Sequence, residues 1–193
     1  MQALLAYMET QKKIPINEDD DRKPINPYAE TKLDGEVLAK KYSEMNVRVI
    51  GLRYFNVFGP RQSKEYAGVI KLFLEKIKQK IPPKINGDGL QTRDFVHIDD
   101  VVMANILAME SNIKHKFFNV GTGNSISILD LANVIINASG LSLEPIHDPE
   151  LSGDVRAPQA DTTLIRKLLN WEPKIRLDNW LTKIISNKDF QDI

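Results

Sequence analysis

The stretch Asn26-Pro27-Tyr28-Ala29-Glu30-Thr31-Lys32 opens the first long helix of this chain and carries its most informative pair of side chains. Asn26 is a favourable N-cap, and Pro27 suits the first helical turn, where its missing N–H costs no hydrogen bond. Tyr28 and Lys32 are four residues apart, so both lie on one face of the predicted helix. An ammonium close to a phenol favours the phenolate form, so the pair can take a proton from an alcohol and return it. The same spacing also occurs by chance, as a half-buried tyrosine beside a solvated lysine.

Working outward, helical and strand patterns alternate along the chain. The helix is predicted over residues 27–45, with an apolar face made of Leu33, Val37, Leu38 and Tyr42. The apolar run Val47–Phe55 predicts a strand buried on both faces, which is typical of a parallel sheet. Further helices are expected at 69–80, 99–110, 127–138, 163–169 and 179–185, and a short strand at 117–120. This alternation predicts an α/β protein.

The composition excludes several classes of function. The chain has 193 residues, 42% of them hydrophobic and 27% charged, which is enough for one domain with a core. Its net charge of zero gives no electrostatic case for nucleic acid or an anionic membrane. The absence of cysteine excludes disulfides and thiolate metal sites and is compatible with the cytoplasm. The three histidines lack ligand-like spacing, so no metal is expected. The charged run Glu18–Lys23 predicts a surface loop.

One expected motif is missing from the printed sequence. A dinucleotide pyrophosphate is usually cradled by a glycine-rich turn between a strand and a helix. Gly121-Thr122-Gly123 is too short and lacks the third glycine, so it is interpreted as an ordinary turn after a strand.

Six motifs occur in order and together span nearly the whole chain. They are Asn26–Lys32, Leu52–Arg61, Gly87–Gly89 with Gln91–Val101, Phe118–Gly123, Gly153–Arg156 and Leu169–Pro173. In this order they resemble the C-terminal part of the extended short-chain dehydrogenase/reductase family, above all NAD-dependent sugar-nucleotide epimerases of the UDP-glucose 4-epimerase type. The resemblance implies an incomplete Rossmann-like parallel sheet, its N-terminal half absent, over residues 1–62 and about 92–122. A small α/β substrate-binding lobe would occupy about 63–91 and 123–193.

The resemblance also implies roles for single residues, with NAD as the cofactor and a nucleotide sugar, UDP-linked, as the substrate. Tyr28 would be the catalytic base and acid, Lys32 would hold the nicotinamide ribose, and Phe55 would lie beside the nicotinamide. Substrate contacts would come from Asn56 near the diphosphate, from Arg93 on it, and from Asp154 at the ribose hydroxyls. In such an enzyme hydride passes to NAD, the 4-keto sugar turns over, and hydride returns to the opposite face.

Simpler interpretations of the same residues stay open. Arg93 could form a surface ion pair with Asp94 or Asp88, and Asp154 could be a plain loop residue. Phe55 and Asn56 could serve only as packing and turn residues at a strand end.

The chain departs from the family pattern at four positions. Ala3 occupies the place of a catalytic serine or threonine, Asn86 that of an aromatic residue near the base, and Leu151 that of an arginine on the diphosphate. Lys71 replaces a proline and could supply a cation instead. A sheet without its first strands also has an exposed edge and an uncovered apolar face, so the Val47–Phe55 strand is expected to lack flanking strands.

These observations support three hypotheses. The first is a truncated or split 4-epimerase that binds NAD poorly alone and could be completed by a separately encoded N-terminal Rossmann half. The family resemblance also implies a homodimer, through a helix pair that would include the Tyr28 helix. The second is a non-catalytic sugar-nucleotide-binding or interaction subunit. The third is a 4,6-dehydratase or a reductase of the same family. The dehydratase ranks lower, because Leu4 and Leu5 stand where dehydratases carry an acidic residue.

Overall fold

A computed structural model describes residues 2–4, 14–24, 26–62, 68–150 and 158–187. Three parallel strands form the central sheet in the order β1–β2–β6, with β1 at Gln2–Leu4, β2 at Val49–Tyr54 and β6 at His115–Val120. The predicted parallel sheet is therefore confirmed. The expectation that the Val47–Phe55 strand lacks flanking strands is wrong, because β2 lies between β1 and β6. Within the described ranges, the outer edge of β1 pairs with no other strand.

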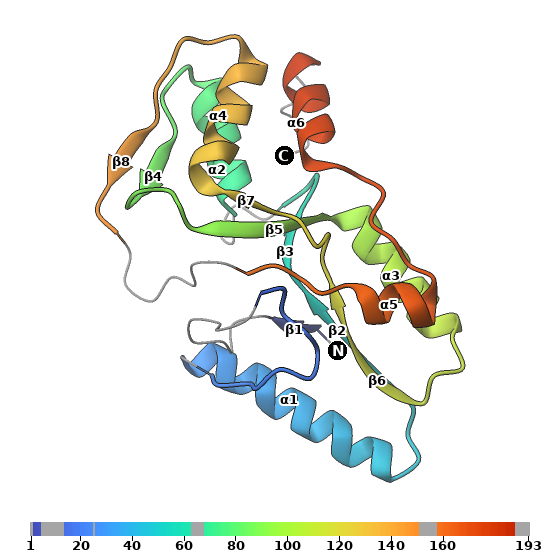
Figure 1. The fold of residues 1–193 in the computed structure, drawn as a ribbon. Coiled ribbons are helices and arrows are strands. Elements are labelled where there is room, and N and C mark those ends of the chain that lie inside the picture. The colour runs from blue at the N-terminus through green and yellow to red at the C-terminus, as the bar shows by residue number, and fades with distance from the viewer. Residues whose placement is uncertain (1, 5–13, 25, 63–67, 151–157, 188–193) are drawn as a thin grey trace.

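Helices cover both faces of this sheet (Figure 1). One face carries α1 (Pro27–Glu44), and the other carries α3 (Ile98–Glu110) and α5 (Thr163–Leu169). Successive strand residues point to opposite faces, so Leu52 and Phe118 join the core under α3 and α5 while Arg53 points toward α1. The Trp171 indole seals this core, and its N–H donates to the carbonyl oxygen of Asp100 at 2.9 Å.

A second apolar core lies beside the sheet, in the upper part of Figure 1. It is formed chiefly by three helices, α2 (Val69–Lys78), α4 (Ile128–Ser139) and α6 (Leu177–Ser186). Two small sheets complete this part, β3 (Asn56–Phe58) with β5 (Thr92–His97) and β7 (Ser125–Ser127), and β4 (Lys84–Asn86) with β8 (Ile146–Asp148). β3 follows β2 after one residue, so the carboxyl end of the central sheet leads directly into this second core.

The helix boundaries follow the local signals in the sequence. The Asn26 side chain accepts the backbone N–H of Ala29 at 2.9 Å, and Ser127 caps α4 through the N–H of Asp130, also at 2.9 Å. Gly140 ends α4 in the left-handed conformation, with φ of 69°. All the predicted helices are confirmed, with ends shifted by at most two residues. In the described part of the chain, no helix is both long and apolar enough to cross a membrane.

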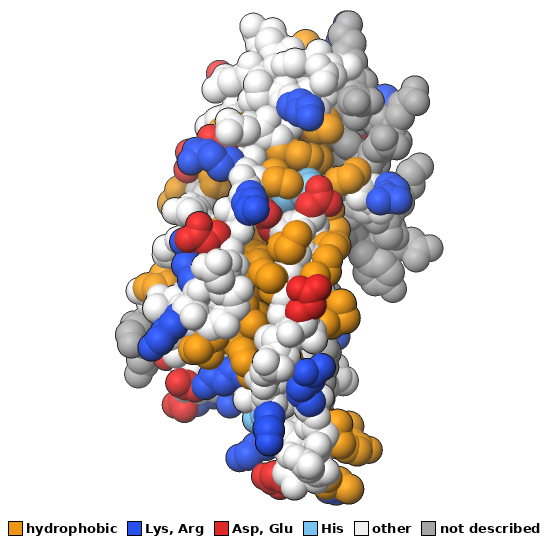
Figure 2. All heavy atoms as spheres, turned by 90° about the vertical axis from the view of Figure 1, so that its right-hand side faces the viewer, with side chains coloured by type: hydrophobic (Ala, Val, Ile, Leu, Met, Phe, Trp, Pro, Cys, Tyr) orange, Lys and Arg blue, Asp and Glu red, His pale blue; other side chains and the backbone are white. Residues whose placement is uncertain are grey.

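Most of the apolar face predicted for α1 is exposed: Leu33 packs partly buried beside Ala29 and Phe55, but the other three residues do not face the sheet. Val37 is 62% exposed, Leu38 53% and Tyr42 48%, whereas α1 buries Ala29, Glu36 and Ala39. This exposed stripe and the buried face are therefore different sides of the same helix. A second exposed apolar set lies on α3, where Val102, Met103 and Met109 are 48%, 44% and 67% exposed. Figure 2 views the molecule from the side of α3 and α5 and shows hydrophobic side chains gathered there.

Candidate functional site

Tyr28 and Lys32 lie side by side at the start of α1. Because α1 follows β1 and precedes β2 in the parallel sheet, its first turn lies at the carboxyl end of the strands, where α/β sheets bind ligands. The Lys32 Nζ lies 5.0 Å from the centroid of the Tyr28 ring. Tyr28 is 49% exposed, so its phenol is accessible from outside the fold. The structure thus brings the predicted proton-transfer pair together on one accessible turn.

Phe55 lies directly behind this turn. It follows the last residue of β2, is 2% exposed, and packs in a small cluster with Ile16, Ala29 and Ala160. Its backbone N–H donates to the carbonyl of Val120 at 3.0 Å, which ties it to the end of β6. Phe55 therefore supports the turn that carries Tyr28, and its contact with a nicotinamide stays a prediction.

Asn56 and Arg93 belong to neighbouring strands. Asn56 begins β3, and its side-chain amide donates to the backbone carbonyl of Asp94 at 3.3 Å. Arg93 lies in β5 and is half-buried, and its guanidinium donates to the carbonyl of Thr92 at 2.6 Å. Asn56 is thereby held against the strand that carries Arg93, and the diphosphate contacts of both residues stay predictions. Asp154 lies outside the described residues, so its predicted role stays a prediction.

Asp94 is a buried structural residue that the sequence analysis considered only as a surface partner for Arg93. It is fully buried, and its two oxygens accept the backbone N–H groups of Thr122, Gly123 and Ala160 and the Thr122 hydroxyl, at 2.6–3.0 Å. Burial raises the pKa of Asp94 above its ordinary value, against the opposing effect of these hydrogen bonds. A surface ion pair with Arg93 does not fit such a carboxylate. Asp94 instead joins β5 to the Gly121–Gly123 turn and to Ala160, which precedes α5.

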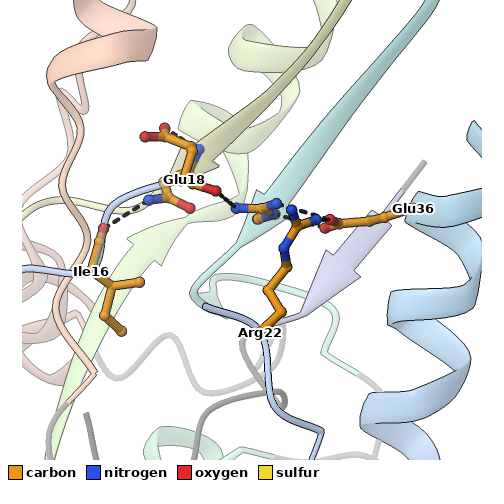
Figure 3. Close-up of polar contacts among 6 residues, drawn as sticks. Ile16, Glu18, Arg22 and Glu36 are labelled. Carbon is orange, nitrogen blue, oxygen red and sulfur yellow. Dashed lines mark hydrogen bonds and ion pairs between the residues drawn. The ribbon is translucent and has the colours of Figure 1, made fainter. Parts of the chain in front are cut away.

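A buried polar network lies between α1 and the sheet, and the sequence analysis missed it (Figure 3). Glu36 of α1 binds the guanidinium of Arg53 on β2 through two contacts of 2.8 Å, and it also pairs with Arg22. Burial acts to raise the pKa of Glu36, but Arg53 and Arg22 together hold it below its ordinary value, so the carboxylate is charged. The sequence did contain a signal for this network: Arg53 is the single charged residue in the apolar run Val49–Tyr54. An arginine buried in such a strand needs a partner of opposite charge.

The loop before α1 is also anchored, so its prediction as a surface loop is wrong at Glu18. That side chain is 5% exposed and accepts the backbone N–H of Asn119 at 2.8 Å, while its backbone carbonyl accepts a bond from Arg53 at 2.9 Å. Burial raises the pKa of Glu18 above its ordinary value. Ile16 forms a parallel bridge with Ala160, so the loop is attached both to the central sheet and to the segment before α5.

Lys71 does not stand free as the spare cation considered above. It is 3% exposed, and its ammonium donates to the carbonyl of Gln62 at 2.5 Å. Among the described residues, no group of three or more histidine, aspartate or glutamate side chains could hold a metal ion.

A cavity of about 490 Å³ lies away from Tyr28, between the turn after β6 and the connection from α5 to α6. Arg166 and Arg176 at its wall are paired with Glu172 and Asp178. Of the predicted site residues, the five that the structure describes (Tyr28, Lys32, Phe55, Asn56 and Arg93) do not line this cavity.

Fold and site define the class of protein first. A parallel sheet with helices on both faces, and a tyrosine–lysine pair on the helix that follows a strand, make this a Rossmann-like α/β protein. Residues 6–121, more than half of the chain, match the NAD dependent epimerase/dehydratase family. The chain belongs to this family of NAD-dependent proteins, and some of its structural neighbours were solved with NAD bound.

Three relatives illustrate the similarity. The UDP-glucose 4-epimerase of Mycolicibacterium smegmatis is 36% identical over 173 residues, which are 89% of this chain and 55% of that protein. The Thermotoga maritima UDP-glucose 4-epimerase, solved with UDP-glucose, superposes with a TM-score of 0.91 at 34% identity. The match covers 98% of this chain and 63% of the Thermotoga maritima chain. The Bacillus cereus UDP-glucuronic acid 4-epimerase, solved with UDP-glucuronic acid and NAD, superposes with a TM-score of 0.86 at 30% identity. The match covers 97% of this chain and 60% of the Bacillus cereus chain. The chain thus spans only part of each relative's length.

Proposed function

We propose that this chain is the acid–base and substrate-binding portion of a cytoplasmic UDP-sugar 4-epimerase. The observation that carries the proposal is the contact between Lys32 and the half-exposed Tyr28 ring at the carboxyl end of a parallel sheet. Tyr28 would take the proton from the sugar C4 hydroxyl and return it. Arg93, Asn56 and Asp154 would bind the nucleotide diphosphate and ribose, for which a guanidinium is well suited.

The residues present fit one end of the cofactor. Lys32 has the donors for the nicotinamide ribose hydroxyls, and Tyr28 lies beside it. The pyrophosphate end has no match, because the printed sequence contains no glycine-rich turn of the kind that binds it. Bound NAD would supply the hydride acceptor and donor. We therefore expect weak NAD binding and impaired turnover by the chain alone.

A separate N-terminal Rossmann half is the partner that these features favour. The open edge of β1 offers unpaired backbone groups for another parallel strand. The exposed Val102 and Met103 on α3 offer apolar surface next to the same sheet. We propose that a chain carrying the glycine-rich turn pairs with β1 and covers this surface.

A non-catalytic sugar-nucleotide-binding or interaction subunit is the second candidate. It is favoured by Ala3, which supplies no hydroxyl at the position where the family resemblance places the serine or threonine that binds the reacting oxygen. Such a subunit would keep Arg93 and Asn56 as ligand contacts while Tyr28 transfers no proton.

Two measurements separate these candidates. Calorimetric titration of the chain with UDP-glucose and, separately, with NAD should show sugar-nucleotide binding and no micromolar NAD affinity; micromolar binding of NAD by the chain alone would refute the idea of a missing cradle. Co-expression with a family Rossmann half should then restore 4-epimerase turnover, and Tyr28→Phe should lower it by about 10²–10⁴-fold. Tyr42→Phe is the matched control, because Tyr42 is an equally exposed tyrosine on α1. Binding without turnover in the reconstituted pair would favour the non-catalytic subunit.

A further inference from the structure

The contact between α1 and the sheet contains few groups that could fix its orientation. Of its 18 residues, α1 buries Ala29, Glu36 and Ala39, while Val37 and Leu38 face outward. Alanine methyl groups are small and present nearly the same surface when a helix turns slightly about its axis. Leu33, which packs partly buried beside Ala29, makes an apolar contact, and such contacts are not directional. A directional contact is therefore needed to hold the helix at one rotation, and Glu36 is the buried α1 residue that can make one.

Glu36 forms that directional contact with Arg53 of β2. Nε of Arg53 donates to Oε1 of Glu36 and an Nη donates to Oε2, each at 2.8 Å, so the two planar groups meet as a fork. Another Nη of Arg53 donates to the carbonyl of Glu18 at 2.9 Å (Figure 3). One guanidinium thus joins the middle of α1, the loop that precedes α1, and the central strand of the sheet.

Arg53 itself is held in place from its other side. The Phe117 ring of β6 lies with its centroid 5.4 Å from the guanidinium carbon. That ring occupies the space above Gly51, where a Cβ would lie only 2.2 Å from ring atoms of Phe117. The glycine therefore allows the aromatic ring to confine the arginine, and the arginine confines the helix.

We propose that Glu36 and Arg53 are positioning residues that fix the rotation of α1 about its axis and thereby the place of Tyr28 and Lys32 in the site. The proposal rests on the proposed role of Tyr28 in proton transfer. Glu36 follows Lys32 by four residues and Tyr28 by eight, so the fork acts one and two turns along the same rigid helix. A rotation of about 20° at a side-chain radius of about 5–6 Å moves a side-chain tip by about 2 Å. A displacement of about 1 Å is already enough to impair a catalytic group about 10²-fold.

The chain contains no cysteine, which makes a direct measurement of this rotation practical. Nitroxide labels at Lys40→Cys on α1, away from its exposed apolar stripe, and at Met109→Cys on α3 use two exposed positions on helices that cover opposite faces of the sheet. Pulsed electron paramagnetic resonance then reports the distance between α1 and α3 in the folded molecules. We compare the labelled parent with E36Q, with R53K, which keeps the charge but loses the fork, and with the double variant E36L/R53M.

The double variant separates positioning from stability, because apolar replacement of both partners of a buried pair often preserves stability. We expect E36L/R53M to stay folded and to shift or broaden the distance distribution by about 2 Å, with E36Q and R53K changing it in the same sense. D100N is the matched control. Asp100 is a buried carboxylate that accepts the N–H groups of Lys174 and Ile175 on the other face of the sheet, so its loss should lower stability and leave the distance unchanged.

The outcomes distinguish this proposal from the proposed function. A parent-like distance distribution in a folded E36L/R53M variant would overturn the positioning role, whatever the enzyme does. A changed distribution together with full turnover by a reconstituted Tyr28→Phe enzyme would keep the positioning role and remove the catalytic one. If both proposals hold, reconstituted E36L/R53M should lose kcat by at least about 10-fold, with KM for the UDP-sugar nearly unchanged.

Discussion

The Asp94 carboxylate binds Thr122 twice, through the backbone N–H at 2.8 Å and through the hydroxyl at 2.6 Å, both on Oδ1. Oδ2 accepts the N–H groups of Gly123 and Ala160. This single side chain therefore joins the turn after β6, the strand that carries Arg93, and the segment around Ala160 that leads into α5.

Replacing Asp94 by asparagine should destabilise the protein. The amide NH₂ would face backbone donors, leaving at least one buried N–H without an acceptor, which costs roughly 2–3 kcal/mol. Urea unfolding of D94N against the parent measures this loss. Asp34→Asn is the control, because Asp34 is an exposed aspartate on α1, and it should change the unfolding free energy by less than about 0.5 kcal/mol. Equal stability of D94N and the parent would contradict the anchoring role.

The second prediction concerns pH and His97. Its Nδ1 accepts the Asp99 N–H at 3.2 Å and so caps α3, and burial lowers the pKa of His97, although Asp99 and Asp100 act to raise it. As the pH falls below the ordinary histidine pKa of 6.5, His97 takes up a proton in the unfolded chain before it does so in the folded protein. The free energy of unfolding should therefore decrease as the pH drops below 6.5. This decrease is complete once the pH lies below the lowered pKa of His97 in the folded protein.

H97N tests this dependence, because asparagine retains a capping oxygen but does not titrate. Unfolding free energies measured from pH 8 to pH 5 should show a shallower decline in H97N than in the parent. Parallel curves for the two proteins would show that His97 contributes nothing to the pH dependence.

A third prediction concerns the contact between Gly51 and Phe117. Gly51→Ala should cost about 1–3 kcal/mol, because its methyl group would overlap the ring. Phe117→Leu in the same chain should recover part of that loss, which a double-mutant cycle detects. Gly140→Ala provides the comparison. Its Cβ would meet nothing within 4 Å, so only its φ of 69° is unfavourable, and Phe117→Leu should not relieve that cost. Strict additivity for the Gly51 pair would contradict the steric account.

The exposed stripe of α1 supports a prediction about self-association. Val37, Leu38 and Tyr42 are all about half exposed or more on one helix, and exposed apolar clusters of this kind mark contact surfaces. We expect the chain to form a homodimer that Leu38→Glu converts to a monomer, as measured by light scattering after size-exclusion chromatography. Met109→Glu introduces the same charge on α3 and should leave the dimer intact. A parent that is monomeric at high concentration would exclude this interface.

The helices were predictable because their signals are local. Asn26 and Ser127 satisfy N–H groups within three residues, and Gly140 needs only its own backbone freedom. The tyrosine–lysine pair was predictable for the same reason, since one helical turn brings the two side chains together. The predicted places of Phe55, Asn56 and Arg93 depended on family resemblance, because strand partners cannot be deduced from their spacing in the chain.

The sequence by itself determined the helix positions, the parallel character of the strand Val49–Tyr54 and the pairing of Tyr28 with Lys32. Only the tertiary structure decided which charges are buried and which side of α1 faces the sheet. Glu18 meets Asn119 across 101 positions of sequence, and Arg53 meets Glu36 across 17. The physical reason is that a charged side chain is stable in the interior only where a partner from elsewhere in the chain reaches it, and that meeting exists only after folding.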